Sequence, residues 1–246
     1  MRKKAPKLSD FDRTKPIITI DNQSTDLTDE QIKRLIPALQ AQIDEDFRPA
    51  WGLTARLKFK PKTKLKTPHM QLIIKDVSDE KGDLGYHFRE GFPVAYIFAK
   101  DAMADADDID GLSTVISHEL LEMIADPGVN LLAAQPPPGR ARNVRIFSYE
   151  VCDPVEANSY KKRDVTVCDF VYPEWFEPEH EANEMQMDYL GVVSSPFQLA
   201  PGGYIDRLIH NEWKTIWGPT AKKKPAASRH RLTVRSSGRG NRKATP

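Results

Sequence analysis

The chain has 246 residues, enough to bury a full core, and its formal net charge of +1 is typical of an ordinary soluble protein. No run of apolar residues is long enough to span a bilayer, and the first residues lack the apolar segment of a secretory signal, so we expect a cytoplasmic protein with no membrane span. Two cysteines, Cys152 and Cys168, are too few for a disulfide framework, and we expect free thiols.

The first half of the chain has the pattern of a sheet interrupted by one long helix. After a polar, flexible lead-in at residues 1–15, four apolar or alternating segments are predicted as strands: 16–20, 54–59, 69–75 and 93–99. Thr28 and Gln31 form a plausible capping box at the start of the helix. Apolar residues then recur at spacings of three and four up to Phe47. Pro37 is expected to kink this helix or to mark a late start, and Pro49 with Gly52 to end it.

Two polar segments lie on either side of the predicted strand at 93–99. Residues 76–91 contain Gly82 and Gly85 and are predicted as a loop, which includes His87. Loop packing is the preferred role for His87, and also for Tyr149 later in the chain, over stabilisation of an oxyanion. Residues 101–110 are rich in aspartate and are predicted as a second loop.

A second helix, over residues 113–127, carries the residues that matter most for function. His118 and Glu122 are four apart and therefore share one helix face, where they could grip a single ion. Glu119 follows the histidine directly, where hydrolases with a His-Glu-x-x-His helix keep their general base. Apolar residues surround this face, so it should be partly buried, and buried carboxylates are costly unless they are paired or coordinated. The helix stops at Asp126, before Pro127.

The remaining ligands must come from elsewhere in the chain. Glu150 is the preferred third ligand, and Asp153 either orients His118 or joins the ligand set. These two acids share a face if their segment is helical; both could instead be turn acids, but ligation is preferred by a small margin. Asp126 competes for the same role, with helix termination as its alternative. Cys152 is an unlikely ligand beside so many oxygens.

The end of the chain gives weaker signals. Residues 164–172 are predicted as a strand or hairpin arm, and residues 188–204 as irregular structure. From Gly218 onward there are nine lysines and arginines and no acid, so we expect a basic disordered tail at residues 219–246. Without aromatics between its charges, that tail could bind nucleic acid or an anionic surface non-specifically.

These motifs resemble the zincin metallopeptidases, and more narrowly a little-characterised group of bacterial and phage proteins with a His-Glu-x-x-Glu variant. The resemblance covers about residues 17–204. Besides the helix and residues 150–156, it is carried by these segments: 51–52, 85–87, 159–160, 170–176, 196–197 and 202–204. It implies a zincin-like α+β domain at residues 16–218, in which a twisted mixed sheet packs on a long helix and an active-site helix, with an irregular C-terminal portion. It also implies metal binding, but it does not identify a substrate.

The expected function is a zinc-dependent peptidase, with another divalent metal as an option. His118, Glu122 and Glu150, with Asp153, would hold the metal, and Glu119 would be the general base. The strand at 94–99 would offer its edge to an extended peptide or protein substrate. Replacing a histidine ligand by Glu122 makes the site harder and the metal a weaker Lewis acid. The alternatives are a non-catalytic, metal-stabilised binding or virion-associated module that docks through the basic tail, and an amide hydrolase acting on cell-wall peptides.

Overall fold

A computed structural model describes most of the chain: residues 15–60, 70–78, 83–105, 109–136 and 144–219. The expected lead-in up to residue 14, the basic loop at 61–69 and the basic tail from residue 220 lie outside the described residues.

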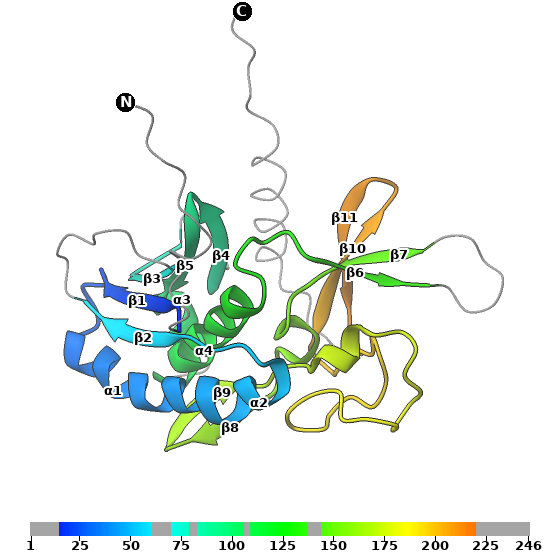
Figure 1. Cartoon of the computed structure of the whole chain (residues 1–246). Helices are drawn as coiled ribbons and strands as arrows, with labels where there is room; N and C mark the ends of the chain where they lie inside the picture. The colour runs from blue at the N-terminus through cyan, green and yellow to red at the C-terminus, as the bar shows by residue number, and fades with distance from the viewer. Residues whose placement is uncertain (1–14, 61–69, 79–82, 106–108, 137–143, 220–246) are drawn as a thin grey trace, which may run out of the picture.

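A five-stranded sheet forms one half of the described structure, with strand order β2-β1-β3-β5-β4 (Figure 1). The strands are β1 (Ile17–Asn22), β2 (Arg56–Phe59), β3 (Met70–Lys75), β4 (Gly85–Glu90) and β5 (Phe92–Phe98). The pairs β1–β2, β1–β3 and β3–β5 are parallel, whereas β4 runs antiparallel to β5. All four predicted strands are therefore present within a mixed sheet.

The edge strand of this sheet corrects two predictions. Residues 85–90, predicted as loop, form β4, and β4 rather than β5 is the outer strand on this side. Of the two glycines that indicated a loop, Gly82 lies outside the described residues, and Gly85 lies within the strand at a close approach. A Cβ on Gly85 would lie 3.0 Å from the carbonyl oxygen of Tyr96 and 3.0 Å from Cγ1 of Val115. The missing side chain therefore lets β4 lie against the helix that carries Val115.

The long helix packs on one face of this sheet. It consists of α1 (Asp29–Ala41), a π-helical segment (Gln42–Phe47) and α2 (Arg48–Trp51). The capping box of Thr28 and Gln31 is confirmed. The helix continues through Pro37, and Pro49 lies in its last segment rather than ending it. Its end is at Gly52, in the left-handed conformation at φ 67°.

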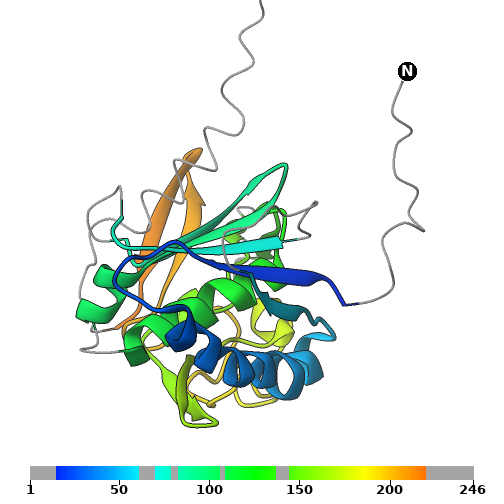
Figure 2. The ribbon, with the colours of Figure 1, turned by 90° about the vertical axis from the view of Figure 1, so that its left-hand side faces the viewer.

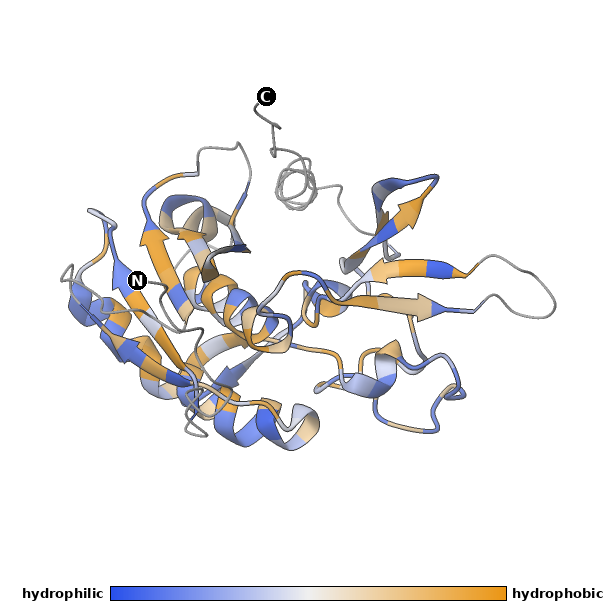
Figure 3. Ribbon diagram, turned by 45° about the horizontal axis from the view of Figure 1, so that its top comes forward, coloured by the Kyte–Doolittle hydropathy of each residue, from blue (hydrophilic) through white to orange (hydrophobic). Residues whose placement is uncertain are grey.

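The second helix, α4 (Ile109–Ala125), begins a turn earlier than predicted and is almost entirely buried. It packs against β4 and β5 on one side and against the hairpin strand β9 (Val165–Cys168) on another. Figure 2 shows α1 and α4 on the same side of the main sheet. The expected aspartate-rich loop is partly helical, because α3 (Ala99–Asp105) occupies its first half. In Figure 3 the strands of the main sheet combine hydrophobic stretches with hydrophilic ones, and β5 (Phe-Pro-Val-Ala-Tyr-Ile-Phe) is the most apolar of them in sequence.

The C-terminal part contains a second sheet that was not predicted. This antiparallel sheet has the order β11-β10-β7-β6, and β8 pairs with β9 in a separate hairpin. The elements are β6 (Leu132–Gln135), β7 (Arg145–Ser148), β8 (Ser159–Lys162), β10 (Tyr204–Ile209) and β11 (Glu212–Trp217), with 3₁₀ turns at Asp153–Val155 and Pro173–Phe176. The prediction of an irregular C-terminal portion holds for residues 177–203 and is wrong for the sheet. The fold is α+β, with several sheets and few helices.

Within the described ranges, no helix combines the length and apolar character needed to cross a bilayer.

Candidate metal centre

The helix α4 presents its three predicted site residues to the interior. His118 is 6% exposed, Glu119 is 1% exposed and Glu122 is fully buried. The residue before them, Ser117, fixes this stretch of helix. Its hydroxyl donates to Oε1 of Gln42 at 2.7 Å and accepts from the backbone N–H of Cys168 at 3.0 Å. The helix is thereby bonded to the π-helical segment on one side and to β9 on the other.

One ring nitrogen of His118 contacts two carboxylates. Its Nε2 is 3.2 Å from Oε1 of Glu122 and 3.2 Å from Oδ1 of Asp153. The backbone N–H of Cys152 also donates to Oε1 of Glu122 at 3.3 Å. The structure therefore brings the predicted helix pair and the predicted downstream acid Asp153 together.

A second histidine, His87 on β4, belongs to the same cluster. The sequence pattern predicts loop packing for this residue rather than a place in the site. It is 4% exposed. Its Nδ1 lies 3.0 Å from Oε2 of Glu119 and 3.6 Å from Oε2 of Glu122. Its Nε2 lies 3.6 Å from Oε2 of Glu150. The signal that could have found it is the alternation from Gly85 onward, which places Tyr86 and Phe88 on one face of a strand and His87 on the other. By contrast, Tyr149 packs as expected, with its ring stacked 4.1 Å from that of Phe176.

Glu150 and Asp153 do not share a helix face, because their segment is a loop that enters a 3₁₀ turn only at Asp153. They still point into the cluster, since the loop is held from both sides. The N–H of Val171 donates to the carbonyl of Val151 at 2.8 Å, and the N–H of Ala200 donates to the carbonyl of Pro154 at 3.0 Å.

Two groups of potential ligands result, and they share one residue. His118, Glu122 and Cys152 can each place a ligand atom within 4.8 Å of the others, and so can His87, Glu122 and Glu150. Glu150, predicted to join His118, is thus grouped with His87, and Cys152, judged an unlikely ligand, is grouped with His118. The ligand set itself stays a prediction.

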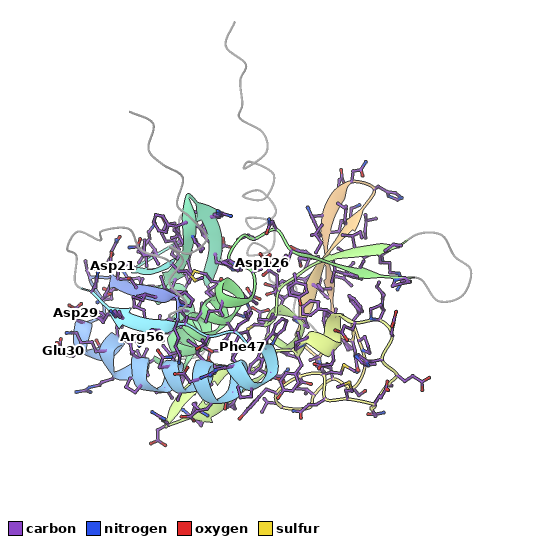
Figure 4. The ribbon with its side chains drawn as sticks, in the orientation of Figure 1. Asp21, Asp29, Glu30, Phe47, Arg56 and Asp126 are labelled. Atoms are coloured by element: carbon purple, nitrogen blue, oxygen red, sulfur yellow. The ribbon has the colours of Figure 1, made fainter. Side chains whose placement is uncertain are left out.

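Asp126 has a different partner. It directly follows α4 (Figure 4), and its Oδ2 accepts a hydrogen bond from the backbone N–H of Leu131 at 2.8 Å. This bond closes the turn after the helix, as expected of a helix-terminating aspartate. Neither of the two groups found in the described part of the chain includes Asp126.

The electrostatics of the cluster reflect its excess of carboxylates. Burial disfavours the charged imidazolium of His87, but Glu150, Glu119 and Glu122 outweigh this effect and raise its pKa to about 9. His118 behaves in the same way: burial opposes its charge, while Glu122 and Asp153 raise its pKa well above the ordinary value. Without a metal, the carboxylates therefore recruit protons to the histidines.

The two cysteines lie beside this cluster as buried free thiols, with their sulfur atoms 3.5 Å apart. Burial, together with the contact to Cys168, raises the pKa of the Cys152 thiol well above its ordinary value. A metal would have to displace that proton to use the sulfur.

Comparisons with protein-family models, with curated proteins and with solved structures gave no match. The chemistry of the cluster must therefore be argued from its own donors. Imidazole nitrogens and carboxylate oxygens are the ligands that zinc and other divalent ions take in proteins. Nε2 of His87 makes no hydrogen bond to any described residue although it is buried, which fits a nitrogen that faces an ion.

Proposed function

We propose that this chain is a divalent-metal-dependent hydrolase of peptide bonds with a zincin-like arrangement. The observation that carries the proposal is the position of Nε2 of His118, 3.2 Å from a carboxylate oxygen of Glu122 and 3.2 Å from one of Asp153. These two acids are far apart in the sequence, because strands β6 and β7 lie between them. Such a convergence of a buried imidazole and buried carboxylates is costly without a cation.

The fold supports the zincin-like part of the proposal. The helix that bears the candidate ligands packs against a mixed sheet whose outer strand on this side is antiparallel to its neighbour. Here α4 packs against β4, and β4 is the last strand of its sheet. An extended peptide would pair with the outer edge of β4. This replaces the strand at 94–99 as the expected docking edge.

Zinc fits the residues present, with other divalent ions as alternatives. His118 and Glu122 would hold it, with a third ligand from Asp153, Glu150 or Cys152. A bound divalent ion supplies Lewis acidity toward a carbonyl and toward water. Glu119 would accept the proton of the attacking water and return it to the leaving amine. Its contact with Nδ1 of His87 fixes the direction of this carboxylate.

One observation favours a second candidate, in which the metal is structural and the module binds rather than cleaves. Every residue of the cluster is at most 6% exposed: His87, His118, Glu119, Glu122, Glu150 and Asp153. A catalytic metal needs an open position, whereas a structural metal is closed in by protein. Docking through the basic tail belongs to this candidate and falls outside the described residues.

The test separates metal binding from catalysis. We expect purified wild-type protein to carry stoichiometric metal at near-neutral pH and His118→Ala and Glu122→Ala to lose it. Glu119→Gln should keep the metal and abolish cleavage of an unstructured protein substrate, while Glu212→Gln, a change at an exposed position on β11, should alter neither.

Absence of metal from the wild-type protein would contradict the proposal. Stoichiometric metal without any cleavage by the wild type would select the structural candidate. Cleavage that survives Glu119→Gln would remove that residue as the base.

A further inference from the structure

We propose that the centre holds two divalent ions, with Glu122 between them, and that His87, Glu122 and Glu150 form the second site. This inference rests on the proposed function for the first ion, at His118. It adds a separate site, contributed largely by β4 and by the loop after β7.

The two oxygens of Glu122 face different histidines. Oε1 lies 3.2 Å from Nε2 of His118, whereas Oε2 lies beside the ring of His87, 3.6 Å from its Nδ1. In the second group, His87, Glu122 and Glu150 can each place one ligand atom within 4.8 Å of the others. Each histidine also lies close to a further acid: Nε2 of His118 is 3.2 Å from Oδ1 of Asp153, and Nε2 of His87 is 3.6 Å from Oε2 of Glu150. A carboxylate with one oxygen toward each of two ligand groups is the arrangement in which a carboxylate bridges two ions. Ions in such pairs stand about 3.5–4 Å apart.

The orientation of His87 is that of a metal ligand. A histidine bound to a metal usually donates its other ring N–H to a carboxylate, which fixes the ring. Nδ1 of His87 has such a partner in Glu119, at 3.0 Å. Nε2 then faces Oε2 of Glu150 at 3.6 Å and is left without a hydrogen bond among the described residues. Glu119 is therefore also a positioning residue for His87.

The charge of the cluster fits two ions better than one. Four buried carboxylates converge here: Glu119, Glu122, Glu150 and Asp153. With both histidines neutral, as metal ligands must be, these side chains carry a formal charge of −4. Two divalent ions cancel that formal charge, whereas one ion cancels half of it and leaves the rest to be balanced by protons on the cluster.

The two sites differ in the kind of ion they suit. The His118 group includes the sulfur of Cys152 and is the softer one, which favours Zn²⁺. The second group combines one imidazole with two carboxylates and is harder, so it suits Mn²⁺ or another oxygen-preferring ion. We therefore expect Zn²⁺ to fill the His118 site first and Mn²⁺ to enter the second site.

The experiment is a metal titration of chelator-treated full-length protein, read by elemental analysis and by Mn²⁺ electron paramagnetic resonance. Wild-type protein should bind two ions per chain. His87→Ala and Glu150→Gln should bind one, and Glu122→Ala should lose both. His180→Ala is the matched control: this histidine pairs with Glu177 outside the cluster, and the variant should still bind two ions. Circular dichroism of each variant checks that it is folded.

Wild-type protein loaded only with Mn²⁺ gives a readout that depends on no variant, because two neighbouring Mn²⁺ ions couple their spins. A single uncoupled ion per chain, retained in His87→Ala, would overturn the second site and leave the proposed function standing. If the wild type binds one ion and His87→Ala binds none, the protein has a single site that uses His87. That outcome also overturns the proposal of two ions. No ion at all would overturn both proposals.

Discussion

Gly203 lies directly against Pro154, so closely that a Cβ on the glycine would come 2.0 Å from the carbonyl oxygen of Pro154. That oxygen belongs to the residue after Asp153, and it also accepts the backbone N–H of Ala200. The start of β10, more than 40 residues along the chain, therefore sets the position of the 3₁₀ turn that carries a candidate ligand.

Gly203→Ala should destabilise the protein by about 1–3 kcal/mol, as overpacking does in a tight interior, because a backbone atom must shift. The displaced turn should also weaken metal binding through Asp153. Chemical denaturation and metal titration measure the two effects. Gly128→Ala is the control, because its Cβ would meet only the side-chain end of exposed Asn130, and this variant should cost less. Equal losses of unfolding free energy in both variants would show that the contact between Gly203 and Pro154 does not position the turn.

Glu122→Gln should change the stability of the metal-free and metal-loaded protein in opposite directions. In the metal-free protein it removes one negative charge from a fully buried position among other carboxylates, so its melting temperature should rise. With metal present it removes a ligand, so the wild type should gain about 2.7 kcal/mol at a metal concentration 100 times its Kd, and the variant should gain little. Thermal unfolding with metal and with chelator measures both. A variant that still gains stability from metal would exclude Glu122 as a ligand.

Ser117→Ala should cost about 1–3 kcal/mol, because it leaves buried polar groups of Gln42 and Cys168 without the hydroxyl. It should also loosen α4 beside His118 and so weaken metal binding. Urea denaturation gives the stability. The control is Thr114→Ala on the same helix, whose hydroxyl donates to the carbonyl of Asp110 within that helix. A loss no larger than the control's would show that the Gln42 contact contributes little.

A buried pair of aspartates away from the cluster predicts a pH dependence. Asp169 and Asp188 are both fully buried. Burial and the neighbouring Asp188 raise the pKa of Asp169 from 3.8 to about 8. The folded protein therefore keeps a proton that the unfolded chain has released between these values. The contribution of this proton to stability is full below about pH 4 and is lost as the pH rises to about 8.

Asp169→Asn removes this dependence, because an amide can donate to Asp188 without titrating. The difference in unfolding free energy between the variant and the wild type should shift in favour of the variant by at most about 1.4 kcal/mol per pH unit across that window. It should level off above pH 8. Urea denaturation at a series of pH values measures this difference. If the unfolding free energies of the two proteins depend on pH in the same way, Asp169 does not hold the proton as predicted.

The sequence predicted those parts of the fold that repeat with a clear period. The four strands and both helices of the first half follow from apolar residues spaced by two or by three and four, and the start at Thr28 follows from its capping box. The site residues on α4 follow from the same spacing. What failed depended on contacts between distant segments. Gly85 indicates a loop by composition, yet it is required in a strand because Val115 packs against it.

The same reason explains the partner of Glu150. Sequence spacing could bring Glu150 and Asp153 near the helix, but which histidine each one faces depends on where β4 lies in the sheet. With β4 assigned to a loop, His87 had no reason to meet α4, and a single ion was the natural expectation. The strands β10 and β11 were missed because turn-forming residues precede them and polar residues interrupt their apolar positions.

The burial of the cluster bears on how fast an ion would exchange. His118, the most exposed of the six residues, is only 6% accessible, so an ion bound as proposed would enter and leave when β4 or the loop at 150–153 opens away from α4. A titration would then load the chelator-treated protein, and a chelator would strip it, only as fast as the fold opens.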